Sequence, residues 1–463
     1  MSLAITIGAL LFLMVVAYRG FSVILFAPIA AMLAVFLTDP AAVPSLFTGL
    51  FMEKMAGFAK LYLPVFVLGA LFGKLIDISG FARTIAASVI RVFGPQRAMV
   101  AIVFICALLT YGGVSLFVVV FAVYPFAAEM FRQGNIPKRL IPGTIALGAF
   151  SFTMDALPGA PQIQNIIPTT FFHTTTWAAP WLGFIGSLFI LAMGVIYLEW
   201  RRRTAAAAGE TYGAGHNNEP EVAHTQPVIA VGVALSPLLV VVVVNNALTH
   251  FIPRFYGVTN ETLLPGMADP IITQIQSVTA IWAVEGALLC GILAVFALSF
   301  AAIGRKFAEA SKAAVAGALL ASMNTAAEYG FGAVIATLPG FLAIREALKH
   351  IPNPLLNEAV TVTTLAGITG SASGGLSIAL AGMADQFISA AQAAGIPLEV
   401  LHRVASMASG GMDTLPHNGA VITLLAVTGL THRQSYGDIF AITCVKTLSV
   451  FIVIAFYYAT GIV

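Results

Sequence analysis

Charged residues are scarce in this 463-residue sequence, in which Asp, Glu, Lys and Arg together make up only 9%. A soluble domain has about 25% charged residues, so this composition excludes a surface that faces water throughout. The net charge is +2, which gives no reason to expect a nucleic-acid partner. The three cysteines lie far apart within apolar stretches, a pattern that fits neither disulfides nor metal ligands. The sequence suggests no cofactor and no metal site.

Apolar runs dominate the sequence, and 59% of the residues are hydrophobic. Many runs approach the ~20 residues that a helix needs to cross the hydrocarbon core. We therefore expect an all-α polytopic membrane protein, located in a bacterial inner (cytoplasmic) membrane. The first run has no basic n-region and no cleavage site, so it is interpreted as a spanning helix. The expected crossings are 3–18, 21–37, 61–76, 100–109, 116–128 and 177–198, followed by 227–244, 280–300, 313–338, 360–369, 378–391 and 439–458.

One segment is polar throughout, from Arg201 to Gln226. It begins with three arginines directly after a span, and basic loops favour the cytoplasmic side. The sequence thus predicts a first transmembrane repeat over 1–200, a cytoplasmic linker over 201–226, and a second transmembrane repeat over 227–463.

The two halves share a series of short motifs in the same order. Tyr111-Gly-Gly-Val-Ser115 precedes Asp155-Ala-Leu-Pro158, and Gly374-Gly-Leu-Ser377 precedes Asp413-Thr-Leu-Pro416. The second-half motifs lie 258 to 262 residues after the first-half motifs (413 − 155 and 377 − 115). If each half crosses the membrane an odd number of times, the second repeat is inverted relative to the first. Inverted repeats with broken helices at the midplane are typical of secondary transporters.

Each motif contains residues that interrupt a helix. Gly costs about 1 kcal/mol and Pro about 3 kcal/mol relative to Ala in a helix interior, and unsatisfied backbone survives in a membrane only when it lines a cavity or is buried in protein. We interpret the Gly-Gly-x-Ser motifs as the tips of re-entrant hairpins and the Asp-x-Leu-Pro motifs as interrupted helices. New helix N-termini suit a carboxylate, and freed carbonyl oxygens suit a cation. The alternative is that these residues only allow kinks and close helix packing.

The polar residues around these breaks are the candidate site. The predicted substrate-binding residues are Tyr111, Gly112, Gly113, Ser115, Thr153, Asp155, Pro158, Gln162, Gln164, Asn165, Asn324, Thr325, Ser371, Ser373, Gly374, Gly375, Ser377, Asp413, Thr414, His417 and Asn418. The predicted cation-coupling residues are Asp155, Asp413, Glu328 and His417, because ionisable groups at membrane depth are functional by default.

Simpler roles stay open for several of these residues. Asp155 and Asp413 could instead cap the half-helices that follow them, since Asp is a good N-cap residue. Asn324 and Thr325 could form interhelical hydrogen bonds. His417 could be a neutral hydrogen-bond donor instead of a proton carrier.

At Tyr111–Ser115, Ile136–Asn165 and Asp413–Asp438 the sequence resembles the gluconate permease (GntP) family of secondary transporters. The resemblance spans nearly the whole chain and lies nearest the short hydroxycarboxylate (3-hydroxybutyrate-type) branch, because Leu157–Gln162 replaces the His- and Pro-rich run of the sugar-acid members. It implies cation-coupled uptake of small hydroxy- or keto-acids and, from the wider group, a homodimer. The Gly-Gly-x-Ser tips and Asp-x-Leu-Pro breaks would then frame the substrate.

From these observations we predict a symporter, not an enzyme, in which H+ (or Na+) drives uptake of a small organic anion across the lipid bilayer. Alternating access would come from moving one part of each repeat. Two competitors are an intramembrane hydrolase and an anion channel. For a serine protease the Gly-x-Ser-Gly nucleophile motif is incomplete, because Ser371 stands where its first glycine would be.

Overall fold

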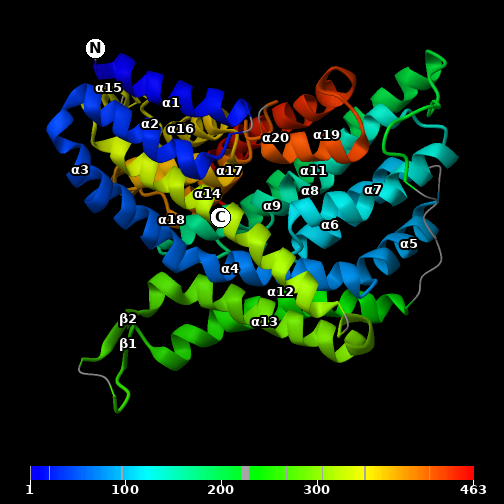
Figure 1. The fold of residues 1–463 in the computed structure, drawn as a ribbon, viewed down its shortest axis with the longest axis horizontal. Helices are drawn as coiled ribbons and strands as arrows, with labels where there is room; N and C mark the ends of the chain where they lie inside the picture. Colours follow the sequence, from blue (N-terminus) through cyan, green and yellow to red (C-terminus); the bar gives the residue numbers. More distant parts are fainter. Residues whose placement is uncertain are drawn as a thin grey trace.

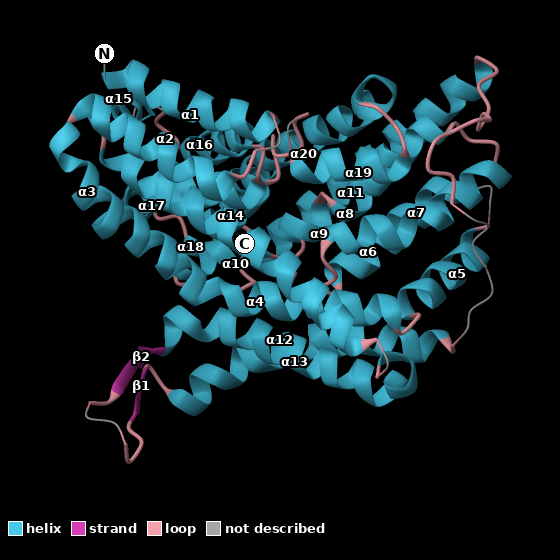
Figure 2. Ribbon diagram, in the orientation of Figure 1, coloured by secondary structure: helices cyan, strands magenta, loops and turns pink. Residues whose placement is uncertain are grey.

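The fold is known from a computed structural model, which describes residues 2–19, 21–94, 97–220, 229–266, 269–304, 306–348, 351–416 and 418–463. The predicted site residue His417 lies outside the described residues. The described chain is almost entirely helical, as predicted, with one small β-hairpin (Figures 1 and 2).

The first half of the chain contributes the helices up to Ala207. They are α1 (Ser2–Tyr18), α2 (Val23–Thr38), η1 (Pro40–Ala42), α3 (Val43–Ser45), η2 (Leu46–Phe51), α4 (Met52–Ile78), α5 (Phe81–Phe93), α6 (Ala98–Tyr111), α7 (Leu116–Gln133), η4 (Lys138–Leu140), α8 (Ile141–Ala149), α9 (Phe152–Asp155), α10 (Ile163–Phe172) and α11 (Pro180–Ala207).

The second half contributes the remaining elements. They are α12 (Val231–Tyr256), β1 (Thr259–Thr262), β2 (Ile271–Gln274), α13 (Ile275–Ile303), α14 (Phe307–Thr337), α15 (Pro339–Leu348), α16 (Pro354–Thr369), α17 (Ala372–Ala393), α18 (Leu398–Ser409), α19 (Gly419–Thr428) and α20 (His432–Thr460).

Several helices have the length and composition of membrane spans. Within the described residues, five helical stretches qualify as spans: 40–78, α11, α12, α13 and α20. Their outer faces are apolar: Leu188, Val243 and Leu293 are 64–68% exposed. Because such side chains avoid water, these faces suit the hydrocarbon of a bilayer. The protein is a multi-pass membrane protein.

Long helices form one side of the molecule. α4 packs against both α13 and α14, and α12 runs beside α13 at the lower edge of Figure 1. The hairpin between α12 and α13 projects from this edge, with β1 antiparallel to β2 and Thr259 opposite Gln274. These helices form a wall beside the shorter, interrupted helices.

Two helical hairpins turn sharply where the sequence predicts tips. α6 ends at Gly112, and Gly113 has φ 97°, a left-handed conformation that glycine adopts readily. α16 ends at Gly370 with φ 65°, and Ser371 caps α17 by accepting a hydrogen bond from Gly374 N. One detail of the prediction is wrong: Gly374, Gly375 and Ser377 lie in the first turns of α17, and the second turn is formed by Gly370 and Ser371.

Two helices are interrupted at the predicted Asp-x-Leu-Pro motifs. The first is broken at Phe150–Ser151 and again over 156–162, which separates α8, the single-turn α9 and α10. The second is broken between α18, which ends at Ser409, and α19, which begins at Gly419; the described residues of this break are 410–416 and 418. These two interrupted helices are the pieces that position the candidate site.

The polar segment predicted as a linker begins inside α11, which continues to Ala207. Its later residues are fastened to the first half: Arg139 pairs with Glu210, and Lys138 donates to Asn217 O at 2.8 Å. The described part of this segment is therefore docked on the helices around it.

Candidate substrate and coupling site

The two interrupted helices meet at Asp155 and Gly410. Asp155, at the end of α9, is 1% exposed, and a methyl group added at Gly410 would overlap its Oδ2 atom. Ser406 Oγ donates to the Asp155 backbone carbonyl at 2.7 Å. Asp155 Oδ2 has no hydrogen-bond partner among the described residues. The two interrupted helices, whose Asp-x-Leu-Pro motifs are 258 residues apart in the sequence, are thus in direct contact at Asp155.

Lys446, on α20, joins the two breaks from the other side. Its Nζ lies 2.6 Å from Asp413 Oδ1 and donates to Phe150 O at 2.8 Å. Phe150 is the last residue before the first break, so its carbonyl has lost its helical partner. Lys446 and Asp413 are 2% and 4% exposed. The ammonium group therefore stands between a carboxylate and a freed carbonyl, a set of ligands that also suits a metal cation.

A second buried cation, Arg403 on α18, organises the first break. Its guanidinium donates to Ala178 O at 2.6 Å, to Asn165 Oδ1 at 3.1 Å and to the Asp155 carbonyl at 3.4 Å. The neighbouring His402 also contacts Asn165 Oδ1, at 3.1 Å. Arg403, His402 and Asn165 are all fully buried. This network holds α9, α10 and the loop before α11 against α18.

Each broken helix is tied to the hairpin of its own half by a side-chain amide. Gln162, which precedes α10, donates to Thr110 O at the end of α6 at 2.7 Å. Asn418, which precedes α19, donates to Gly370 O at the end of α16 at 2.7 Å. In the first half Tyr111 adds a bond from its hydroxyl to Pro158 O at 2.9 Å. In both halves the residue before the second part of the interrupted helix is thus hydrogen-bonded to the hairpin, in the second half at Gly370 and not at the predicted tip Gly374–Ser377.

The second hairpin turn carries a cluster of hydroxyls that faces α14. Thr325 Oγ1 lies 3.2 Å from Ser373 Oγ, and Ser371 Oγ lies 3.5 Å from Glu328 Oε2. A methyl group added at Gly374 would overlap the Glu328 carboxyl group. Glu328 is 4% exposed. This cluster places a carboxyl group against the N-terminal turn of α17, where a helix dipole favours negative charge.

Other predicted residues form local hydrogen bonds or lie away from this cluster. Thr153 donates to Gly148 O, and Thr414 Oγ1 lies 2.5 Å from Thr443 Oγ1. Ser377 lies along α17 and lines a separate cavity. Among the described residues, four predicted side chains keep a buried oxygen without a hydrogen-bond partner: Asp155, Gln164, Asn324 and Ser377.

The alternative role of the two aspartates as N-caps is wrong. The residue at the N-cap position of α10 is Gln162, and the N-cap of α19 is Asn418, whose Oδ1 accepts from Val421 N at 2.9 Å. Asp155 and Asp413 lie earlier in the breaks and leave these positions to amides. Their burial at the meeting point of the breaks needs another explanation than capping.

Sequence reasoning missed Lys446, Arg403 and His402. Lys446 lies within the predicted crossing 439–458, where a charged residue in an apolar run is itself a signal of function. Arg403 and His402 precede the Asp413 motif in a segment of mixed polarity, and nothing in their spacing indicates the partners they find. Within the described residues, no group of three or more His, Cys, Asp or Glu side chains is arranged as a metal site.

Comparisons with known proteins agree with a transporter. No protein-family model matches the chain. It is 56% identical over 472 residues to the uncharacterized transporter YxjC of Bacillus subtilis (strain 168), an alignment that covers all of both chains. Among solved structures, the Alcanivorax borkumensis YdaH transporter is similar with a TM-score of 0.51 and 16% identity, over 91% of this chain and 90% of that one. MtrF of Neisseria gonorrhoeae, described as one of a class of antimetabolite efflux pumps, gives a TM-score of 0.47 and 12% identity over 90% and 84%.

The likeness to YdaH shows a shared fold, and the 56% identity to YxjC shows common descent over the full length. On this ground the chain belongs to the family of membrane transporters that includes YxjC of Bacillus subtilis.

Proposed function

We propose that this transporter is a proton-coupled symporter that carries a short hydroxycarboxylate such as 3-hydroxybutyrate, or a sugar acid such as gluconate. The observation that carries the proposal is Asp155, a fully enclosed carboxyl group with one oxygen unpartnered among the described residues, at the contact of the two breaks. Burying an unpaired carboxylate is costly, so such a group takes up a proton. A site that changes its exposure during transport would bind and release that proton. Sodium is the less favoured coupling ion.

The charges near the breaks support different roles for the predicted coupling residues. Asp413 already has a counter-charge in Lys446 at 2.6 Å. Glu328 has Ser371 as its hydrogen-bond partner, and no Lys or Arg of the described chain forms an ion pair with it. We therefore assign proton carriage to Asp155 and Glu328, with Asp413 acting through Lys446. His417 stays a prediction.

The second hairpin turn supports binding of an organic anion. Ser371, Ser373 and Thr325 offer hydroxyl groups beside the N-terminus of the 22-residue helix α17. Helix N-termini bind anions through their free N–H groups. A substrate carboxylate and an ionised Glu328 would repel each other there, so the anion binds once Glu328 carries a proton. This order of binding couples transport of the organic anion to transport of the proton.

The wider architecture belongs to the same proposal. We propose membership of the gluconate permease (GntP) family, two inverted repeats, alternating access, a homodimer, and an inner-membrane location with residues 201–226 in the cytoplasm. The matched amide bonds of Gln162 and Asn418 support related halves. The molecular mass of the protein in lipid nanodiscs would test the dimer, and reaction of cysteines placed in the linker with impermeant reagents would test its side.

The central test is uptake into proteoliposomes of labelled 3-hydroxybutyrate, gluconate and lactate under an imposed proton or sodium gradient. We expect the proton gradient to accumulate 3-hydroxybutyrate, and Asp155→Asn and Glu328→Gln to abolish accumulation. Asp385→Asn, an exposed carboxylate on α17, is the matched control and keeps normal uptake. Accumulation that persists in both site variants would refute the assignment of the proton carriers.

The same assay separates a symporter from its competitors. A channel would let the labelled anion equilibrate without concentrating it against a gradient, and an intramembrane hydrolase would cleave a peptide substrate without moving an anion. Either result would overturn the proposed function.

A further inference from the structure

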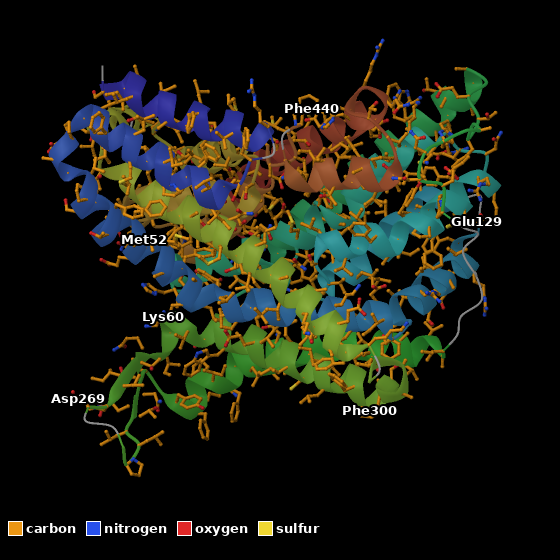
Figure 3. All side chains as sticks on the ribbon, viewed as in Figure 1. Met52, Lys60, Glu129, Asp269, Phe300 and Phe440 are labelled. Atoms are coloured by element: carbon orange, nitrogen blue, oxygen red, sulfur yellow. The ribbon has the colours of Figure 1, made fainter. Side chains whose placement is uncertain are left out.

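Beside the second hairpin turn lies a cavity of about 250 Å³ between α4, α10, α14 and α17. Its first wall is the beginning of α4, where Met52 and Lys60 are labelled in Figure 3. The residues that line it are Glu53, Lys54, Gly57, Phe58, Leu61, Tyr62, Ile167, Thr170, Phe171, Tyr329 and Ser377. Pockets for drug-sized ligands occupy roughly 300–1,000 Å³, so this one suits a smaller molecule.

The cavity combines aromatic walls with several hydroxyl groups, and the charged pair Glu53 and Lys54 also lines it. The ring centroids of Phe58 and Tyr62 lie 4.5 Å apart. The ring centroid of Tyr329 lies 5.7 Å from that of Phe58 and 6.3 Å from that of Phe171. The Tyr62 hydroxyl lies 2.7 Å from Thr170 Oγ1. Rings of this kind bury the apolar part of a ligand, and isolated hydroxyls fix its orientation.

An unpartnered hydroxyl contributes to this cavity. Ser377 is fully buried, and its Oγ has no hydrogen-bond partner among the described residues. Buried hydroxyls are nearly always satisfied, and the exceptions call for a ligand, a water molecule or a functional role. Ser377 lies four residues after Ser373 on α17, so both project from the same face of that helix. The cavity therefore lies one helical turn along α17 from the cluster that contains Ser373.

Lys54 supplies a positive charge at this cavity. Its side chain is 42% exposed, and its Nζ lies 4.0 Å from Glu53 Oε1, the limit for an ion pair. An exposed pair at this distance contributes little, so the ammonium remains able to attract an anion. No other lining residue carries a positive charge.

We propose that this cavity is the substrate subsite that selects short monocarboxylates with a single hydroxyl, an inference that rests on the proposed function. In this subsite, which the anion occupies before its carboxylate reaches the N-terminus of α17, the carboxylate lies toward Lys54, the carbon chain packs on the aromatic rings, and the hydroxyl bonds to Ser377. The inner lining offers the hydroxyls of Tyr62, Thr170, Tyr329 and Ser377, and those of Tyr62 and Thr170 already bond to each other. A polyhydroxylated acid such as gluconate would bury more hydroxyls than this set can satisfy. Unsatisfied buried hydroxyls weaken binding strongly.

Two glycines on α4 provide a matched pair of variants. A Cβ at Gly57, which lines the cavity, meets no atom within 4 Å, and the same holds for Gly69, which lies outside it. Gly57→Leu therefore fills the cavity without a backbone clash, and Gly69→Leu makes the same chemical change elsewhere on the helix. Ser377→Ala removes the unpartnered hydroxyl and leaves the cavity open.

The experiment measures equilibrium binding of labelled 3-hydroxybutyrate to the full protein in nanodiscs, together with proton-driven uptake by the same variants. We expect Gly57→Leu to weaken binding about tenfold or more and Ser377→Ala roughly threefold to tenfold, the loss of one hydrogen bond. Gly69→Leu should match the unaltered protein, and unlabelled gluconate should compete weakly.

Two contrary outcomes are distinguishable. If the unaltered protein accumulates 3-hydroxybutyrate while Gly57→Leu and Ser377→Ala bind it normally, the cavity is not the subsite and the proposed function stands. If the unaltered protein neither binds nor accumulates any of the three acids, the proposed function fails and the subsite fails with it.

Discussion

Replacing Lys446 with Met should destabilise the protein strongly, because it removes one member of a buried ion pair. Lys446 and Asp413 have side chains 2% and 5% exposed, with 2.6 Å between Nζ and Oδ1. Removing one partner of such a pair leaves an uncompensated buried charge and costs about 3–5 kcal/mol. The Phe150 carbonyl also loses its donor at 2.8 Å. We expect the free energy of unfolding of Lys446→Met to fall by an amount in that range.

The double variant Asp413→Asn/Lys446→Met separates charge from packing. Replacing both members by neutral groups of similar size is often close to neutral, so the double variant should lose only about 1–2 kcal/mol. The losses of the two single variants would then be far from additive, as residues in direct contact show. Unfolding by sodium dodecyl sulfate in mixed micelles, followed by circular dichroism, measures all three.

Lys74 provides the control for this substitution. It pairs with Asp77 at 3.2 Å, but the two side chains are 36% and 40% exposed. Lys74→Met should therefore cost less than about 1 kcal/mol. If Lys446→Met costs no more than Lys74→Met, or if the single-variant losses simply add in the double variant, then the buried pair does not stabilise the meeting point of the breaks.

Two further predictions concern other contacts. Gly410→Ala places a methyl group against Asp155 Oδ2. The free energy of unfolding should therefore fall by about 1–3 kcal/mol, and uptake should fall sharply. A variant with normal stability and normal uptake would show that the two breaks do not touch. In the polar segment 201–226, the hydrogen bond from the Arg139 guanidinium lowers the pKa of the Glu210 carboxyl group. The stabilisation from this pair is therefore present at neutral pH, and it is lost as the pH falls through the lowered pKa. Because both side chains are partly exposed, the effect is below about 1 kcal/mol. The protection of residues 208–220 against hydrogen exchange, relative to the intrinsic exchange rate at each pH, should fall more between neutral and acid pH in the unaltered protein than in Arg139→Gln, and equal falls would contradict this role of the pair.

The interrupted helices were predictable because Pro and Gly have local effects that need no knowledge of the fold. Asp413-Thr-Leu-Pro416 lies in a break, and Asp155-Ala-Leu-Pro158 begins with the last residue of α9 and continues into the break that follows. The second Gly-Gly-x-Ser motif misled the prediction, since Gly374 and Gly375 lie in a helix where α16 and Glu328 come close to the backbone. A glycine that allows close packing and a glycine that turns the chain look alike in a sequence.

The partners of the charged groups could not be predicted, because they depend on packing between distant segments. Lys446 finds the carbonyl of Phe150, which is 296 residues away in the sequence. Arg403 likewise donates a hydrogen bond to the backbone carbonyl of Ala178, which is 225 residues away in the sequence. A sequence shows that such a residue lies in an apolar run, but only the folded chain shows which oxygen it meets.

The two amide bonds from Gln162 and Asn418 constrain how the molecule can open. Each fastens an interrupted helix to the end of the hairpin helix in its own half, at 2.7 Å. A hairpin that moved away alone would leave the buried Asn418 amide, or the half-buried Gln162 amide, and its carbonyl partner without a hydrogen bond, which is costly where water is absent. Each hairpin and its interrupted helix should therefore travel as one rigid piece, with the sliding surface lying against α4, α13 and α14.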